Sequence, residues 1–332
     1  MLVLCIYGKI LIEVICVYIT KYCDDPDHFN MLLYGEAKYP DSISDEYDSI
    51  LAKLDRFVYL VDAYTIIMDC ARDILNTQQK NDELFWKVNK YLLNYVNAVF
   101  CYKEFIRNYD PPLTDIADQY WWCNDRKFWY RFICEYRDRI VHQSIIVRHY
   151  NPREGELLVD LDEILEKTQK DITDGKVKFT TNAEFFLDQI RRLARTPHYV
   201  DRKKHRYWKL KKIIGFANRE ITEMSDTVFQ QAYNGGVSKA VEWLLDHVYY
   251  EEYDNDEDKY TFIVDEKTAH SECEPNLSLE WFFGKMIQGL GKEHQVCKDI
   301  RSLIISKGYT HFYKGDCGID AFMEKCIETD LH

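Results

Sequence analysis

Glycine and proline are scarce in this sequence. Only 13 Gly and 7 Pro occur among 332 residues, whereas a protein built from many short strands needs both residues at its frequent turns. A turn-rich β-sandwich is therefore disfavoured. Apolar residues make up 46% of the chain and aromatic residues 15%, which is enough to bury a sizeable core between long helices.

Cysteine pairs of the CxxC type are absent. The 11 cysteines are odd in number and scattered, which is untypical of a secreted disulfide framework, so reduced thiols and a cytoplasmic location are expected. Two His-x2-Cys pairs, at 270–273 and 294–297, have a spacing reminiscent of zinc ribbons. The second pair falls in a predicted helix rather than a tight turn, and neither a metal nor a cofactor is predicted.

Long uninterrupted apolar runs are also missing. Residues 1–22 nearly reach the roughly 20 residues of a membrane-spanning helix. However, Lys9 and Glu13 lie within this segment and no small-residue cleavage site follows it. The segment is expected to be a buried helix or strand, and no membrane partner is predicted.

Phosphate-binding glycine loops and the H-E-x-x-H and G-x-S-x-G motifs are absent as well, so the common NTPase, dehydrogenase, metalloprotease and esterase classes are not indicated.

Basic residues are outnumbered in the chain as a whole, and the net charge of −13 argues against a protein that coats nucleic acid by bulk attraction. Residues 191–212 are the exception, with ten Lys or Arg against the single acid Asp201. Tyr199, Tyr207 and Trp208 lie among them and could stack on bases, although a solvated helix face explains the stretch as well. The predicted RNA contacts in this stretch are Arg191, Arg192, Arg195, Lys203, Lys204 and Arg206.

Apolar residues recur at spacings of three and four over three long segments, which predicts an antiparallel helical bundle. These segments are 44–76, 82–107 and 114–142, the last with a possible break at 123–125. A hairpin of strands at 144–150 and 156–161 is expected to follow. Further helices are predicted at 161–169, 182–194, 207–249 with a break at 234–236, and 277–303.

The third predicted helix ends in the sequence Arg137-Asp138-Arg139-Ile140-Val141-His142. This is an R-x4-H pattern with a polar residue directly after the Arg. It resembles the catalytic motif of HEPN domains (higher eukaryote and prokaryote nucleotide-binding), in which Asn, Asp or His often follows the Arg. The resemblance covers about residues 44–200, where the motif lies after two long helices as in the HEPN bundle.

The residue types in this motif suit the cleavage of RNA without a metal. His142 can transfer protons near neutral pH, and Arg137 can hold a phosphate with two hydrogen bonds. Asp138 precedes His142 by four residues, so the two share a helix face and the carboxylate can orient the imidazole. Arg137 lies about 140° around the helix from His142. The resemblance implies a composite site in a homodimer, which would bring one subunit's Arg to the other's His.

The helical patterns and the resemblance together predict a mainly α protein with three regions. They are an N-terminal apolar segment and polar turn (1–43), a HEPN-like bundle with a small β-hairpin excursion (44–200) and an additional, mostly helical C-terminal region of unknown role (201–332).

As to function, the resemblance implies a metal-independent endoribonuclease of the toxin, abortive-infection or antiviral-defence type. Its partners would be RNA, such as tRNA or another structured RNA, and a possible regulatory protein. Arg139 and Arg148 are expected as further phosphate contacts. The alternative is a non-catalytic helical protein that uses the same surface to bind a nucleotide or a protein.

Overall fold

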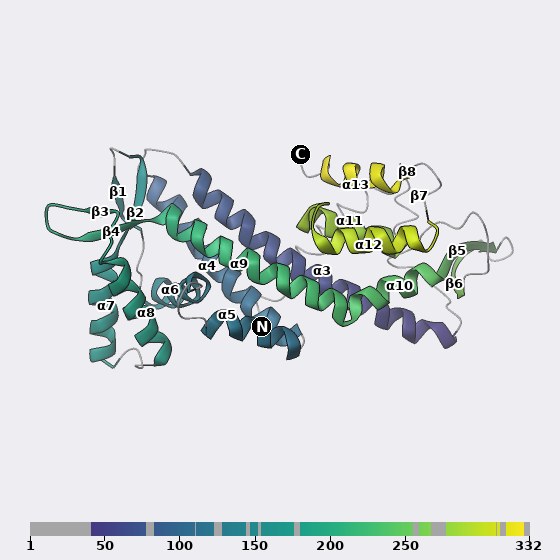
Figure 1. The fold of residues 1–332 in the computed structure, drawn as a ribbon, viewed down its shortest axis with the longest axis horizontal. Helices are drawn as coiled ribbons and strands as arrows, with labels where there is room; N and C mark the ends of the chain where they lie inside the picture. Colours follow the sequence, from purple (N-terminus) through teal and green to yellow (C-terminus); the bar gives the residue numbers. More distant parts are fainter. Residues whose placement is uncertain are drawn as a thin grey trace.

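A computed structural model describes most of the chain beyond residue 40. The described residues are 41–77, 83–109, 111–122, 128–143, 147–151, 154–175, 180–254, 259–266, 277–309, 311–312 and 317–328. The protein is elongated and mainly helical, as predicted, with small antiparallel sheets towards its two ends (Figure 1). The apolar segment 1–22 and the 270–273 pair lie outside the described residues.

Three long helices run along the molecule: α3 (Asp41–Asn76), α4 (Glu83–Tyr109) and α9 (Leu210–Ala232) (Figure 1). Tyrosines of α3 and α4 form hydrogen bonds with polar side chains of α9. Tyr64 of α3 lies 3.1 Å from Thr222 Oγ1, and two tyrosines of α4 form the others. Tyr102 donates to Ser225 Oγ (2.8 Å) and Tyr95 donates to Asn218 Oδ1 (2.7 Å). Buried hydroxyls need such partners, so these bonds also fix the register of the helices.

The third predicted helix is divided into α5 (Pro111–Trp122) and α6 (Trp129–Gln143). Pro111 suits the first turn of α5, where its missing N–H costs nothing. Helix α6 packs against α4, α5, α8 and α9. Its first turn is held by Glu220 of α9, whose Oε2 accepts the backbone N–H of Tyr130 (2.9 Å).

A four-stranded antiparallel sheet follows α6, in the order β1 (His149–Asn151), β2 (Glu156–Asp160), β4 (Arg206–Lys209) and β3 (Tyr199–Val200). The β1–β2 hairpin confirms the prediction. Strand β4 lies where a helix was expected, because Tyr207 and Trp208 pair with Asp160 and Val159 of β2. The remaining elements at this end are α7 (Leu161–Thr173) and α8 (Thr181–Leu193).

The C-terminal region is helical, as expected, but also contains a hairpin that was not predicted. The expected break at 234–236 is a π-helical kink, η1 (Tyr233–Val237), between α9 and α10 (Ser238–Asp246). The hairpin is formed by β5 (His247–Asp254) and β6 (Lys259–Glu266). The last elements are α11 (Leu277–Leu290), α12 (Gln295–Ser306), β7 (His311–Phe312), β8 (Cys317–Gly318) and α13 (Ile319–Glu328).

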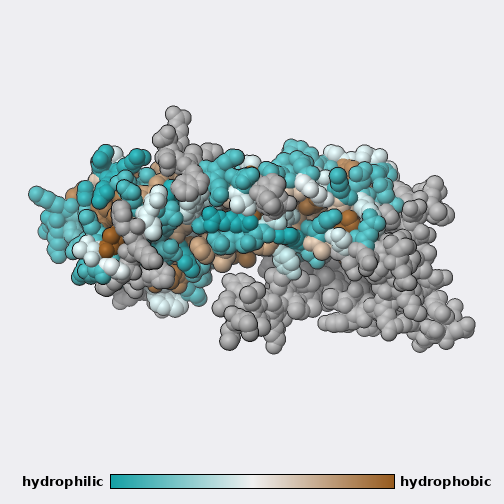
Figure 2. All heavy atoms as spheres, turned by 90° about the horizontal axis from the view of Figure 1, so that it is seen from below, coloured by the Kyte–Doolittle hydropathy of each residue, from teal (hydrophilic) through white to brown (hydrophobic). Residues whose placement is uncertain are grey.

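A continuous hydrophobic core runs from α3 to α13. Helix α9 lies beyond the domain boundary predicted at residue 200, yet it packs against α3, α5 and α6 of the bundle. Among the described helices, none combines the length and the apolar composition needed to cross a membrane. Among the residues coloured in Figure 2, hydrophilic ones predominate on this side, with small separate hydrophobic areas.

Candidate functional site

Helix α6 is buried from Trp129 to Tyr136, and Arg137 and Asp138 of the R-x4-H motif are its first partly exposed residues. Between Trp129 and Val141, the only residues of α6 that reach solvent are Arg137, Asp138 and Val141. Val141 follows Arg137 by four residues and Asp138 by three, so the three positions lie within about 100° around the helix. Position 142 follows Asp138 by four residues in the same helix. The side chain of His142 is outside what the structure describes.

The Arg137 side chain is fixed by three neighbours. Its Nε donates to Asn97 Oδ1 of α4 (3.2 Å), and its Nη1 donates to Asp138 Oδ1 (2.9 Å). The guanidinium carbon also lies 4.4 Å from the centre of the Phe100 ring, a cation–π contact. Two of the five N–H donors of Arg137 therefore have partners among the described residues, and Nη2 remains for an anion. The side chain is 24% exposed.

Two contacts join this part of the chain to α4. Arg137 forms a hydrogen bond with Asn97. Val147, ten residues after Arg137, forms one with Asn89, which lies eight residues before Asn97 on α4. Asn89 accepts the N–H of Val147 (2.8 Å) and donates to its carbonyl (2.9 Å), as a neighbouring strand would. Residues on both sides of position 142 are therefore hydrogen-bonded to α4.

Exposed apolar residues flank the motif. Val141 is 42% exposed on α6, and Leu93 and Trp86 of α4 are 37% and 66% exposed. Trp86, Leu93 and Asn97 are spaced by seven and four residues, so they share one face of α4, which also carries the partner of Arg137. The motif thus lies within a surface that is partly polar and partly apolar.

Arg139 is a correction to the predicted RNA contacts. It is buried, with 6% of its side chain exposed, and lies between Glu135 (3.9 Å) and the Phe186 ring of α8 (5.6 Å). Arg139 directly follows Asp138 and is therefore turned by about 100° around the helix from it, towards the interior. Arg139 cannot meet an external phosphate from there. Arg148, by contrast, is exposed between α6 and β1.

The basic stretch 191–212 spans the end of α8, the β3–β4 hairpin and the start of α9. Its exposed members include five of the predicted RNA contacts: Arg191, Arg192, Arg195, Lys203 and Lys204. Arg206 differs because its guanidinium and backbone N–H bind the carboxylate of Asp162. Of the aromatics proposed to stack on bases, Tyr199 is 41% exposed, whereas Tyr207 and Trp208 are buried.

A cluster of histidines and carboxylates at the end of this sheet was missed by the sequence analysis. Ligand atoms of His149, Asp160 and Glu163 all lie within 4.8 Å of one another. His205 Nδ1 lies 2.9 Å from Asp160 Oδ2, and this hydrogen bond raises the pKa of His205. The residues come from β1, the β2–α7 junction, α7 and the turn before β4. No short sequence motif connects them, so only the pairing of the strands brings them together.

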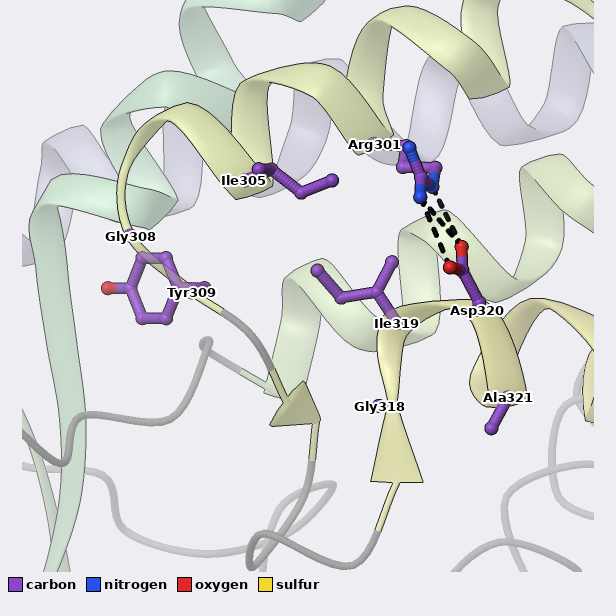
Figure 3. Close-up of a pocket in the computed structure, with 8 residues that line it drawn as sticks. All are labelled: Arg301, Ile305, Gly308, Tyr309, Gly318, Ile319, Asp320 and Ala321. Atoms are coloured by element: carbon purple, nitrogen blue, oxygen red, sulfur yellow. Dashed lines mark hydrogen bonds and ion pairs between the residues drawn. The ribbon is translucent and has the colours of Figure 1, made fainter.

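Two further candidate sites, the His-x2-Cys pair at 294–297 and a surface depression, are explained by structural contacts among their described residues. The second His-x2-Cys pair is structural, since the His294 ring accepts the N–H of Val296 at the start of α12 and Cys297 is buried. A depression of about 380 Å³ lies beside α12 and α13 (Figure 3). Its Arg301 and Asp320 are paired with each other (2.9 and 3.2 Å), and apolar Ile305 and Ile319 line it next to them.

Comparison with known proteins adds no relative. A scan against protein-family models gives no match, and searches of the curated proteins and of the solved structures give none either. Function is therefore inferred from the residues of the chain itself.

Proposed function

We propose that this protein is a metal-independent endoribonuclease of the HEPN type, with its site on α6. One observation supports this most strongly: in a helix that is otherwise buried as far as Val141, the exposed face carries Arg137 and Asp138 of the motif. A structural helix in a core needs no polar opening at this position, whereas a phosphate-binding site does.

Each motif residue has a role in this proposal. Arg137 binds the scissile phosphate through Nη2 and its remaining Nη1 hydrogen, while Asn97 and Phe100 keep the guanidinium in place. His142 exchanges protons with the 2′-hydroxyl and the leaving 5′-oxygen. Asp138 Oδ1 is bonded to Arg137, and the other oxygen, Oδ2, is assigned to orient His142. The product would carry a 2′,3′-cyclic phosphate.

The active form in this proposal is a homodimer in the cytoplasm. Arg137 and position 142 lie about 140° apart around α6, so two copies facing each other across this surface would pair one Arg with the other His. The exposed Trp86, Leu93 and Val141 supply apolar area for such a contact. The exposed arginines and lysines of 191–212 would attract the RNA.

The test is cleavage of a mixed tRNA and structured-RNA pool by the full-length protein in the presence of a chelator. Arg137→Ala and Arg137→Lys should both lose most of the activity, because a lysine cannot bond Asn97, Asp138 and phosphate together. Arg219→Ala is the matched control, since Arg219 is an exposed helical arginine that also lies against an aromatic ring, that of Phe216. The cleavage products should carry cyclic phosphate ends.

Equal cleavage by Arg137→Ala and the wild type would contradict the assignment of the site. RNA binding without cleavage, lost in the same variant, would instead favour the non-catalytic binding protein.

A further inference from the structure

We propose that His149, Asp160 and Glu163 form a binding site for a divalent transition-metal ion of the zinc class, separate from the motif on α6. The residues converge from three elements, β1, the end of β2 and the first turn of α7. Neither the proposed ribonuclease chemistry nor the helical core uses them. The proposal is independent of the proposed function.

The sheet register places these residues on one face. His149 of β1 pairs with Leu158, and Asp160 follows Leu158 by two residues on β2. Paired residues and residues two apart point to the same side of a sheet, so His149 and Asp160 share a face. Tyr207 pairs with Asp160 and lies under the same cluster, with its ring 4.9 Å from that of His149.

Asp160 has one oxygen available for a ligand. Its Oδ1 caps α7 by accepting the N–H groups of Asp162 and Glu163, both at 3.0 Å. Its Oδ2 faces His149 Nε2 at 3.7 Å and His205 Nδ1 at 2.9 Å. The side chain is only 6% exposed, so this carboxylate is aimed into the cluster rather than into solvent.

The separations are close to those of a bound ion. Zinc lies about 2.0–2.2 Å from nitrogen and oxygen ligands, so tetrahedral ligands are about 3.3–3.6 Å apart. The 3.7 Å between His149 Nε2 and Asp160 Oδ2 is near this range, and the farthest pair of the three ligand atoms is within 4.8 Å. Small rotations of the partly exposed His149 and Glu163 side chains would complete the site.

Charge also favours a cation at this place. Two carboxylates, those of Asp160 and Glu163, approach each other here, and Lys167, 3.7 Å from Glu163, is the cation paired with one of them. A divalent ion would relieve the repulsion between the carboxylates. The imidazole ligand favours zinc or a similar ion over magnesium or calcium, which prefer oxygen ligands alone.

His205 is a positioning residue in this proposal. Metal-binding carboxylates are commonly hydrogen-bonded by a residue that does not touch the ion, and His205 donates to Asp160 in this way. Three protein ligands leave one position of a tetrahedral ion for water or an exogenous ligand. The ion would join β1, the strand after α6, to the start of α7.

Zinc binding to the chelator-treated, full-length protein tests the site by calorimetry. His149→Ala and Asp160→Asn should each lose about one equivalent of zinc relative to wild type, and His205→Ala should bind it roughly 10–100-fold more weakly. The asparagine keeps an oxygen to cap α7, so Asp160→Asn should fold. Two control variants, His198→Ala and Glu166→Gln, change neighbouring segments outside the cluster. Both should still bind the one equivalent of zinc.

Cobalt(II) is a second probe that separates this site from the chain's cysteines. The site should bind cobalt without the near-ultraviolet thiolate charge-transfer band, and this thiolate-free binding should vanish in His149→Ala. Equal zinc stoichiometry and affinity in wild type, His149→Ala and Asp160→Asn would overturn the proposal. A cobalt(II) spectrum that shows only thiolate-bound sites would also overturn it. RNA cleavage in a chelator bears only on the motif of α6, so the two proposals can fail separately.

Discussion

Arg137, Arg139 and Arg206 each meet a carboxylate, but they differ in exposure. Arg139 is 6% exposed beside Glu135, Arg137 is 24% exposed beside Asp138, and Arg206 is 40% exposed with Asp162 bound to several of its donors. A guanidinium needs both access and spare donors to bind a phosphate. Of the three, only Arg137 combines partial exposure with a nitrogen, Nη2, that has no partner among the described residues.

The Asp162–Arg206 pair predicts a pH dependence of stability. Hydrogen bonds from Arg206 lower the pKa of Asp162 below that of the unfolded chain, which is about 3.9. The pair therefore stabilises the fold above about pH 4, and this contribution is lost as the pH falls through the lower folded pKa. Since both side chains are partly exposed, Asp162→Asn should cost only about 0.5–1 kcal/mol at neutral pH.

Urea unfolding between pH 6 and pH 3 measures this effect. Asp162→Asn should lose less stability over that interval than the wild type, while Asp115→Asn, at an exposed position of α5, should lose as much as the wild type. An acid-induced loss in Asp162→Asn equal to that of the wild type would show that the pair does not contribute.

The surroundings of the motif residues were only partly predictable from the sequence. The sequence paired Asp138 with His142, whereas the contact between Arg137 and Asp138 was not predicted, because adjacent residues of a helix do not usually face each other. The burial of Arg139 could not be foreseen, because it depends on α8 packing over α6 from 40 residues away. The His149–Asp160–His205 cluster depends on strand pairing of the same long-range kind.

At the level of elements, helix α11 makes a close approach to α3 at Gly289. A Cβ atom at this position would lie 2.3 Å from Val61 Cγ1, and the buried, β-branched Val61 has little room to move. Gly289→Ala should therefore destabilise the protein by about 1–3 kcal/mol. Gly284 is the matched control in the same helix, since its Cβ would meet Cys326 and Phe322 at an ordinary 3.6 Å.

Thermal or denaturant unfolding of both glycine variants gives the comparison. Gly284→Ala should be neutral or stabilising by up to about 1 kcal/mol, because alanine favours helix. If the two variants were equally stable, the close packing of α11 on α3 would be wrong.

Helix α6 depends on α9 for its first turn, where Glu220 accepts the N–H of Tyr130. Glu220 is 5% exposed, so Glu220→Ala should leave a buried donor without this acceptor and cost about 1–3 kcal/mol. Hydrogen exchange should also become faster at the start of α6. Glu223→Gln, on the exposed side of α9, should change neither quantity. Unchanged exchange in Glu220→Ala would contradict the capping role.

The sequence predicted the elements whose apolar residues repeat with a helical period. The segments 44–76 and 82–107 correspond to α3 and α4 within a few residues at each end. Strand β4 was missed because Tyr207-Trp208 continues directly into α9, and only its pairing with β2 makes it a strand. The β5–β6 hairpin was missed for the same reason, since each strand is stabilised by the other.

At the level of the whole molecule, the proposed dimer makes a prediction about mixed subunits. Arg137→Ala and His142→Ala should each be inactive alone, yet mixing and reassembling them should restore part of the activity. Each heterodimer would contain one composite site with both residues. Leu93→Asp should weaken the dimer in light scattering, because a charge would replace exposed apolar surface near the motif. Wild-type activity in a strictly monomeric Leu93→Asp variant would contradict the composite site.

The most direct test compares the RNA cleavage rates of the wild type and His142→Ala in the presence of EDTA. The proposed general acid–base role predicts that the wild type cleaves without metal and that the variant is slower by about 10²–10⁴-fold, with its fold unchanged by circular dichroism. Equal rates in the two proteins, or cleavage by the wild type only when metal is restored, would contradict a metal-independent ribonuclease site on α6.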